Sequence, residues 1–269
     1  DNYKVTEKMQ KRYDITINNA KEFLKECAKQ KVHFHPIGVI QAWSPNSMKR
    51  AASELIDMGY TYIAIGGLVP LDINSCEEIV KSVRDEIGYD IKIHLLGFAK
   101  AKQLDRFIKY KITSFDSTSP LIRAFKDEKD NYYTPKDHYT AIRIPSSQKT
   151  PALKRKVSSG LVDQEEAEKL EEKALSSIRA YDKGEETLEN TLKALEEYEL
   201  IFRDKVPIQR YKDILSSKYW QKCQCEVCQN AKIETIIFRN SNRNRRRGFH
   251  NLWQFQRELE ELREANNIC

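Results

Sequence analysis

One stretch decides the fold class of this chain: residues 60–97 read YTYIAIGGLVPLDINSCEEIVKSVRDEIGYDIKIHLLG. It begins with an apolar run, Tyr60 to Gly67, and ends with another, Asp90 to Gly97, and each run has the length of a buried strand. Apolar residues at helical spacing lie between the two runs: Ile79, Val80 and Val83. A strand, a helix and a strand in this order predict parallel pairing, because a parallel crossover needs a connection of about a dozen residues or more.

The same alternation continues on both sides of this stretch. The strands that we expect are His33 to Gln41, Tyr60 to Gly67, Asp90 to Gly97 and Ile112 to Thr118. Ser44 and Pro45 predict the start of the first connecting helix. Ser75 and Glu78 predict a capping box at the start of the next helix, and Gly88 predicts its end. The pattern predicts an α/β fold with a parallel sheet, either doubly wound or closed into a barrel.

Several residues with binding or catalytic chemistry fall at the ends of these strands. They are Gln41, Gly66, Gly67, Leu96, Gly97 and Asp116. In both types of fold, ligands bind at the carboxyl ends of parallel strands, so these residues are expected to converge on one pocket. Taken singly, a glycine at a strand end is usually part of a turn, and an aspartate there is usually a helix cap. Such residues at the ends of all four expected strands favour a site.

The second half of the chain changes character. A basic linker at residues 149–156 precedes two helical stripes, which Gly184 separates. The stripes consist of Leu170, Ala174 and Ile178, and of Leu188, Leu192, Leu195 and Phe202. The acidic outer face of the first stripe, which includes Glu171, is expected to be solvated. We therefore expect three parts: a βα-repeat part at 1–150, a helical insertion at 151–215, and a zinc-binding part at 216–269 that ends in a helix from Leu252 to Ala265.

Four potential metal ligands lie near the carboxyl end. Cys223, Cys225 and Cys228 fall within six residues, and His250 follows them. Three thiolates and one imidazole are donors that tetrahedral zinc prefers, and a complete protein shell leaves no position for a catalytic water. The sequence therefore predicts a structural Zn²⁺ site, against the alternative of incidental thiols and a surface histidine. The other histidines, His94 among them, are expected to be ordinary strand or surface residues.

A dense basic run lies between the last of these cysteines and His250. Its arginines are Arg239, Arg243, Arg245, Arg246 and Arg247. Guanidinium groups bind phosphate oxygens in bidentate fashion, so the run predicts contacts with a nucleic acid. The alternative is a flexible, solvated loop.

Composition limits the classes of protein to consider. The 269 residues carry 46 Lys plus Arg against 40 Asp plus Glu, which gives a formal net charge of +6, and the mean hydropathy is −0.68. No apolar run approaches the ~20 residues that span a bilayer, and no signal-peptide pattern is present. We therefore expect no membrane association and a cytoplasmic location. Ordinary glycine and proline contents argue against collagen-like and disordered chains.

Five motifs together resemble the tRNA-guanine transglycosylase superfamily. They are Gly-Val-Ile-Gln at 38–41, Ala-Ile-Gly-Gly-Leu at 64–68, His-Leu-Leu-Gly at 94–97, Ser-Phe-Asp-Ser at 114–117 and the Cys-x-Cys-x-x-Cys…His set. Their order and spacing match the family over most of the chain outside residues 150–215. The sequences His-Leu-Leu-Gly-Phe-Ala-Lys and Arg-Arg-Gly-Phe-His-Asn most resemble those of the branch that inserts 7-deazaguanine bases into DNA.

This resemblance implies an enzyme that removes guanine from its sugar and installs a 7-deazaguanine derivative, on a TIM-type (β/α)8 barrel with a zinc-binding subdomain. Asp116 resembles the family's nucleophile, which holds the sugar covalently. Such a carboxylate suits the reaction, because exchange with retained configuration requires two inversions at the anomeric carbon. The residues that resemble the family's base-binding elements are Gln41, Gly66, Gly67, Leu68, Leu96 and Gly97.

The chain departs from the family's pattern at its start. Only about 30 mostly helical residues precede the strand that contains Gln41, where the family has earlier barrel strands and an acidic loop. Four strands do not close a barrel that needs eight. We therefore expect a barrel without its first strands in this chain, with further strands at Tyr139 to Ile144 and Ile233 to Phe238.

Three other functions compete with base exchange in DNA. The first is the same exchange in tRNA, in the manner of queuosine or archaeosine modification. The second is a non-catalytic nucleic-acid-binding partner subunit, and the third is a metabolic barrel enzyme with an incidental zinc clip. The expected partners are DNA, or alternatively tRNA, and a 7-deazaguanine base, with a homodimer or helper proteins as further partners.

Overall fold

The computed structural model describes residues 4–98 and 101–266 of the chain. The chain divides into two compact units, Asp1–Thr118 and Ser119–Cys269. The expected boundary after residue 150 therefore lies inside the second unit. None of the described helices is both long enough and apolar enough to cross a bilayer.

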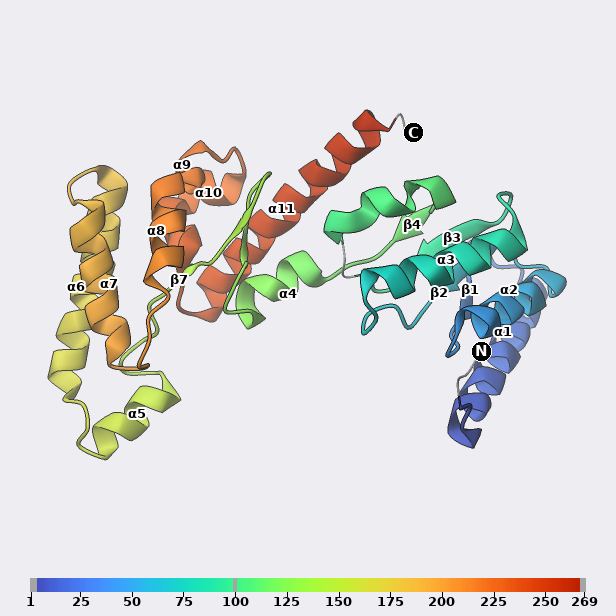
Figure 1. Cartoon of the computed structure of the whole chain (residues 1–269), viewed down its shortest axis with the longest axis horizontal. Helices are drawn as coiled ribbons and strands as arrows, with labels where there is room; N and C mark the ends of the chain where they lie inside the picture. The colour runs from blue at the N-terminus through green and yellow to red at the C-terminus, as the bar shows by residue number, and fades with distance from the viewer. Residues whose placement is uncertain (1–3, 99–100, 267–269) are drawn as a thin grey trace. The chain divides into compact units, whose positions relative to one another are not determined.

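The first unit alternates strands and helices, as the sequence predicts (Figure 1). Its elements are α1 (Glu7–Gln30), β1 (Gly38–Ile40), α2 (Pro45–Asp57), β2 (Tyr62–Ile65), α3 (Ile73–Ile87), β3 (Lys92–Leu95), the 3-10 helix η1 (Ala101–Tyr110) and β4 (Ser114–Phe115). The four strands form one sheet in the order β1-β2-β3-β4, and every neighbouring pair is parallel. An α/β fold with a parallel sheet is therefore confirmed, although each strand is shorter than the apolar run that predicts it.

One face of this sheet is apolar and packs against helices. Its side chains alternate along the strands and are fully buried: Ile40, Ile63, Ile65, Ile93 and Leu95. Gly38 lies on the same face, and a Cβ there would come within 2.5 Å of Leu55 Cδ2 in α2. A side chain at this position would therefore displace Leu55, and glycine lets α2 pack closely on β1.

The opposite face has a different character, because side chains alternate across a strand. The strand register places Val39 beside Ala64, Ala64 beside His94, and His94 beside Ser114. Continuing at a period of two, this face carries Gln41, Gly66, Leu96 and Asp116 at the carboxyl ends of the four strands. Val39 and Leu96 remain 39% and 43% exposed. This open face is the one that bears the candidate site.

The helix caps are partly those that the sequence predicts. Ser44 caps α2, with Pro45 in its first turn, and Gly88 closes α3. The capping box at Ser75 is wrong. Asp72 is the N-cap of α3, and its Oδ1 accepts the N–H groups of Asn74 and Ser75 at 2.9 and 3.1 Å. An aspartate before the helix outcompetes a serine inside it, because its carboxylate reaches the free N–H groups of the first turn.

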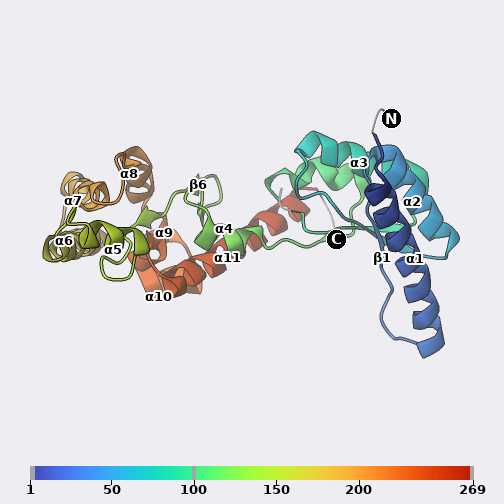
Figure 2. The same cartoon turned by 90° about the horizontal axis from the view of Figure 1, so that it is seen from below.

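The second unit is mostly helical. Its elements are α4 (Ser119–Lys126), β5 (Tyr132–Tyr133), β6 (His138–Tyr139), β7 (Ile142–Arg143), α5 (Pro151–Ser158), α6 (Gln164–Lys183), α7 (Leu188–Leu200), α8 (Ile208–Ser217), α9 (Tyr219–Lys222), α10 (Glu226–Ala231), the 3-10 helix η2 (Lys232–Ile236), β8 (Ile237–Phe238) and α11 (Ser241–Ala265). In Figure 2, α4 lies along α11, and α6 lies beside α7. One core joins the helical segment to the cysteine segment, with Ile142, Ile178 and Tyr211 packed in the same cluster as Cys228.

The further strands expected in the second half are only partly present: the segment expected as a strand from Ile233 is the 3-10 helix η2 up to Ile236, and only Ile237–Phe238 is extended, as β8. β7 pairs in parallel with β8, and β5 pairs antiparallel with β6. Within the described residues neither pair joins the four-stranded sheet. The final helix also differs from the prediction, because it begins at Ser241 instead of Leu252. Asn240 caps it there by accepting the N–H of Arg243, so the arginine run from Arg243 to Arg247 is helical and not a flexible loop.

Candidate active site and metal centre

The candidate active site lies where the four parallel strands end. The backbone ladder continues one residue beyond each strand: Gly66 N–H donates to Ile40 O, Leu96 N–H to Ile65 O, and Asp116 N–H to Leu95 O. These bonds fix the backbone of the strand ends at 2.9, 3.0 and 3.3 Å. The site therefore rests on the rigid part of the unit, which holds side chains more precisely than a free loop would.

Asp116 holds a defined position although its side chain is 53% exposed. Its Oδ1 accepts the N–H of Gly97 at 2.8 Å and lies 3.0 Å from His94 Nε2. The Gly97 N–H is the main cause that lowers the pKa of Asp116 below its ordinary value, and His94 adds to it. The carboxylate is therefore charged and accessible, as a nucleophile must be.

His94 is a candidate site residue that the sequence reasoning missed. It was expected to be an ordinary histidine, yet its ring links Asp116 to Ser114, whose Oγ lies 2.6 Å from His94 Nδ1. The pattern of the sequence contained the signal. His94 precedes Gly97 by three residues and lies on the same face as Leu96, so a parallel register places it beside the strand that ends in Asp116.

The expected base-binding residues lie around the same edge. A Cβ at Gly66 would lie 3.8 Å from Leu96 Cδ2, so these two strand ends are neighbours. Gly67 adopts φ +79° and faces the Gln41 side chain, whose Nε2 would lie 3.7 Å from a Cβ there. Leu68 is only 1% exposed, so its side chain belongs to the core and only its backbone can serve a ligand.

Chemically, this edge combines a charged, exposed carboxylate with groups that suit a flat heterocycle. The Gln41 amide offers both donors and an acceptor, and Gly66 allows close approach of a ligand to the backbone. Leu96 presents an exposed apolar side chain on the same face. The arrangement fits nucleophilic chemistry on a molecule that carries a purine-like ring.

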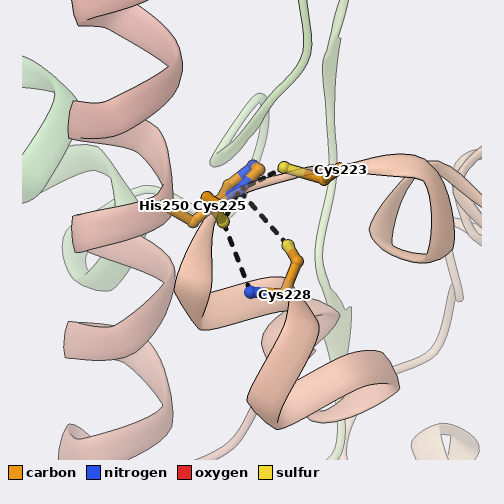
Figure 3. A group of neighbouring side chains, drawn as sticks. All are labelled: Cys223, Cys225, Cys228 and His250. Carbon is orange, nitrogen blue, oxygen red and sulfur yellow. Dashed lines mark hydrogen bonds between the residues drawn. The ribbon is translucent and has the colours of Figure 1, made fainter.

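The four predicted metal ligands meet in the second unit. Figure 3 shows His250, from α11, facing three cysteines from the segment around α10. Its Nδ1 lies 3.6 Å from Cys223 Sγ, 3.3 Å from Cys225 Sγ and 3.4 Å from Cys228 Sγ. All four donor atoms lie within 4.8 Å of one another, and all four residues are buried. This group can hold a metal ion.

The surroundings of His250 fix its tautomer. Its Nε2–H donates to Tyr133 O at 2.8 Å, which leaves the Nδ1 lone pair directed at the cysteines. The Tyr132 ring stacks on the imidazole with a centroid separation of 4.3 Å. A backbone carbonyl on the far nitrogen is the arrangement that orients a metal-binding histidine.

The structure corrects the role expected of three arginines. Arg247 is fully buried, and its guanidinium donates to Thr235 O, Ile237 O and Ala124 O. Arg243 is paired with Glu234 at 2.5 Å. Arg247 holds the second unit together and is not available to a phosphate, whereas Arg243 is half-buried and already paired within the unit. Burial explains the difference, because a desolvated guanidinium must bond with protein groups.

Arg239 is the third. It pairs with Glu171, which is buried and not solvated as expected, and it donates to Ile144 O at 3.2 Å. The other oxygen of Glu171 accepts the N–H of Ser147 at 2.6 Å. Only Arg245 and Arg246 of the run are exposed, on the outer face of α11. They remain candidates for contact with a nucleic acid.

Comparison with known families identifies the class of this protein. The family model described as queuine tRNA-ribosyltransferase matches residues 1–266. The chain therefore belongs to this family, which agrees with the resemblance of its motifs. The match includes both the strand-end site and the cysteine cluster.

One curated protein is similar at the level of sequence. A DNA-guanine transglycosylase of Salmonella montevideo is 39% identical over 247 residues, which cover 90% of this chain. The aligned part is 59% of that protein, so the chain spans about three fifths of the length of its relative.

Proposed function

We propose that this chain belongs to a transglycosylase that exchanges guanine for a 7-deazaguanine derivative in DNA. The observation that carries the proposal is Asp116, a charged and accessible carboxylate held by Gly97 and His94 beside the residues that suit a base. The name of the Salmonella relative supports DNA as the polymer. We further propose that the four strands of the first unit are part of a (β/α)8 barrel.

The reaction would proceed in two displacements at the sugar. Asp116 attacks C1′ of the deoxyribose, the bond from C1′ to N9 of guanine breaks, and its electron pair leaves with the base, which takes up one proton. The incoming 7-deazaguanine base then attacks C1′, loses one proton, and releases the carboxylate. Two inversions retain the configuration, and the two protons balance. The target nucleotide must leave the duplex to reach the strand ends.

Gln41 and Leu96 would hold the base during both steps. Gln41 would bind the polar edge of the purine, since an amide matches both donors and acceptors. Leu96 would lie against the ring face. The glycines Gly66, Gly67 and Gly97 would let the backbone approach the base and sugar closely.

We infer that the metal is zinc and that its role is structural. Zinc bound tetrahedrally at ordinary bond lengths places a sulfur and a nitrogen ligand about 3.5 Å apart. The three distances from His250 Nδ1, 3.3 to 3.6 Å, fit that value. Four protein ligands fill the shell, so the ion would tie α11 to the cysteine segment. Cys223, Cys225 and Cys228 form no disulfide, which suits a reducing compartment such as the cytoplasm.

A denaturing-gel assay tests the function. The protein is incubated with guanine-containing duplex DNA, or with tRNA, and adducts that survive denaturation are counted. We expect an adduct with DNA that Asp116→Ala abolishes. The matched control is Asp90→Ala, which removes an exposed carboxylate just before β3, at the other end of that strand. An adduct with wild type that persists in Asp116→Ala would overturn the assignment of the nucleophile.

A tRNA substrate is the second candidate, because the description of the matching family names tRNA. An Asp116-dependent adduct with tRNA and none with DNA would establish it. The absence of any adduct, with the metal bound and DNA binding intact, would favour a non-catalytic binding subunit.

We also propose that Arg245 and Arg246 contact the phosphate backbone. Both are exposed on one side of α11. The double variant R245A/R246A should weaken DNA binding and flatten its salt dependence by about two counterions. The double variant R257A/R263A, which removes the same charge further along α11, is the control. Equal losses in both pairs would indicate a general charge effect instead of a contact.

A further inference from the structure

A chain of three hydrogen bonds runs across the open face of the sheet and ends on Asp116. Tyr62 Oη lies 2.5 Å from Ser114 Oγ, Ser114 Oγ lies 2.6 Å from His94 Nδ1, and His94 Nε2 lies 3.0 Å from Asp116 Oδ1. The four residues come from β2, β3 and the β4 end, which the ladder holds in register. His94 is only 17% exposed at its side chain, so solvent competes little for its ring.

The directions of these hydrogen bonds follow from the ionised carboxylate of Asp116. An ionised carboxylate can only accept, so His94 must carry its hydrogen on Nε2. On a neutral ring, Nδ1 then accepts the single hydroxyl hydrogen of Ser114. Ser114 Oγ in turn accepts the hydrogen of Tyr62. The donor and the acceptor of each of these three hydrogen bonds are therefore determined, and together the bonds specify a single tautomer of His94.

The bonds also distinguish the two oxygens of Asp116. Both the Gly97 N–H and the His94 ring point at Oδ1. Neither of these two donors lies on Oδ2. Two donors on one oxygen fix the rotation of the carboxylate, and they leave the second oxygen for attack.

We propose that His94 is a positioning residue for the nucleophile, and that Ser114 and Tyr62 hold it in the tautomer with hydrogen on Nε2. The proposal rests on the proposed function, because it gives a role to residues that surround Asp116. His94 does not touch the reacting carbon. It holds Asp116 Oδ1 so that Oδ2 faces the sugar, and the sugar then finds the nucleophile already aligned.

Two substitutions separate the ends of the imidazole. In His94→Gln the amide nitrogen reaches about as far as Nε2 and can still donate to Asp116. In His94→Asn the shorter amide takes the place of Nδ1, so it can reach Ser114 but not Asp116. We expect adduct formation at saturating DNA to fall about 10- to 100-fold in His94→Asn and less than about 5-fold in His94→Gln, which is the range for a hydrogen bond to a charged group. The DNA concentration at half-saturation should be unchanged in both.

Equal rates in wild type and His94→Asn, with Asp116→Ala inactive, would overturn the inference and leave the proposed function standing. Equal losses in His94→Asn and His94→Gln would also overturn it, because a merely structural histidine would not distinguish the two amides. Ser114→Ala and Tyr62→Phe should lower the rate only a few-fold, because they act through His94.

A second measurement does not depend on catalysis. The ¹⁵N shifts of the histidine rings report which nitrogen carries hydrogen, and the His94 signals are assigned by their absence in His94→Gln. We expect hydrogen on Nε2 in wild type and a mixture of tautomers in Ser114→Ala. Hydrogen on Nδ1 in the wild type would overturn the inference even if the enzyme forms the adduct. Hydrogen on Nε2 without any adduct would support the chain of bonds while the proposed function fails.

Discussion

Asp116 owes its properties to atoms that lie far from it in sequence. Gly97 supplies a backbone N–H from the end of β3, and His94 supplies a ring nitrogen from inside the same strand. Gly97 adopts φ +64° at this strand end, a left-handed conformation that glycine reaches without steric cost. The backbone N–H of Gly97 is thus part of what makes the carboxylate a stable anion.

The lowered pKa of Asp116 predicts a titration below the ordinary value of 3.8. A depressed pKa in the folded state means that the hydrogen bonds stabilise the protein above the ordinary pKa, and that this contribution is lost as the pH falls through the folded value. ¹³C NMR of the side-chain carboxyl, assigned with Asp116→Asn, measures the titration. A midpoint at or above the ordinary value would contradict the prediction.

Gly97→Ala should also change the pKa of Asp116. A Cβ at Gly97 would meet Val69 Cγ2 at 3.3 Å, and the positive φ costs an alanine about 1–2 kcal/mol. We expect the backbone to shift, the N–H to leave Asp116, and the pKa of Asp116 to rise toward its ordinary value. Gly59→Ala is the matched control, because Gly59 has φ +101° with nothing within 4 Å. It should cost stability without moving the pKa of Asp116.

At the scale of elements, α11 combines two opposite environments. Its inner face carries Arg247 and His250, both fully buried, and its outer face carries Arg245 and Arg246. Neighbours in sequence therefore serve different purposes, because successive residues on a helix lie about 100° apart. Gly248 lies on the inner face, where a Cβ would come within 3.3 Å of the α4 backbone.

Arg247→Leu should destabilise the second unit by about 3 kcal/mol, since three buried carbonyls would lose their donor. Burial lowers the pKa of Arg247 to about 9, which shows how strongly its charge is desolvated. Urea denaturation followed by tryptophan fluorescence measures the change. Arg246→Leu, one residue away and exposed, should change the stability by less than about 0.5 kcal/mol. Similar costs for both variants would contradict the assignment of Arg247 as structural.

At the scale of the whole molecule, the candidate active site and the candidate metal site lie in different units. The first unit presents the strand-end site on a parallel sheet, whereas the second gathers helices, short strand pairs and the cysteine cluster around one core. The metal ligands contribute to that core, which includes Cys228, Ile233 and Ile236. Loss of the metal should therefore affect the second unit more than the first.

Removal of the metal by a chelator should loosen the second unit selectively. Hydrogen exchange should accelerate in η2 and in the first half of α11, while the amides of β2 and β3 keep their protection. Cys225→Ser should have the same effect, and Cys76→Ser, which alters a buried cysteine of the first unit, is the control. Uniform acceleration in both units, or none in either, would contradict a structural metal confined to the second unit.

The sequence by itself determined what depends on local pattern. The period of the apolar runs predicted four parallel strands, and the close spacing of Cys223, Cys225 and Cys228 predicted a metal cluster. Asp116 and Gln41 were found because strand ends of a parallel sheet share one edge. Each of these signals is carried by residues that are close in the chain or repeat within it.

Only the tertiary structure decided the partners of charged and polar side chains. It placed His94 on Asp116, buried Arg247 among carbonyls, and paired Arg239 with Glu171. The sequence of an arginine run or of an acidic helix does not show whether its charged side chains face water or the core. Burial and pairing arise from elements that meet across long sequence separations, and the desolvation of a charge then determines whether it serves the fold or remains free for a ligand.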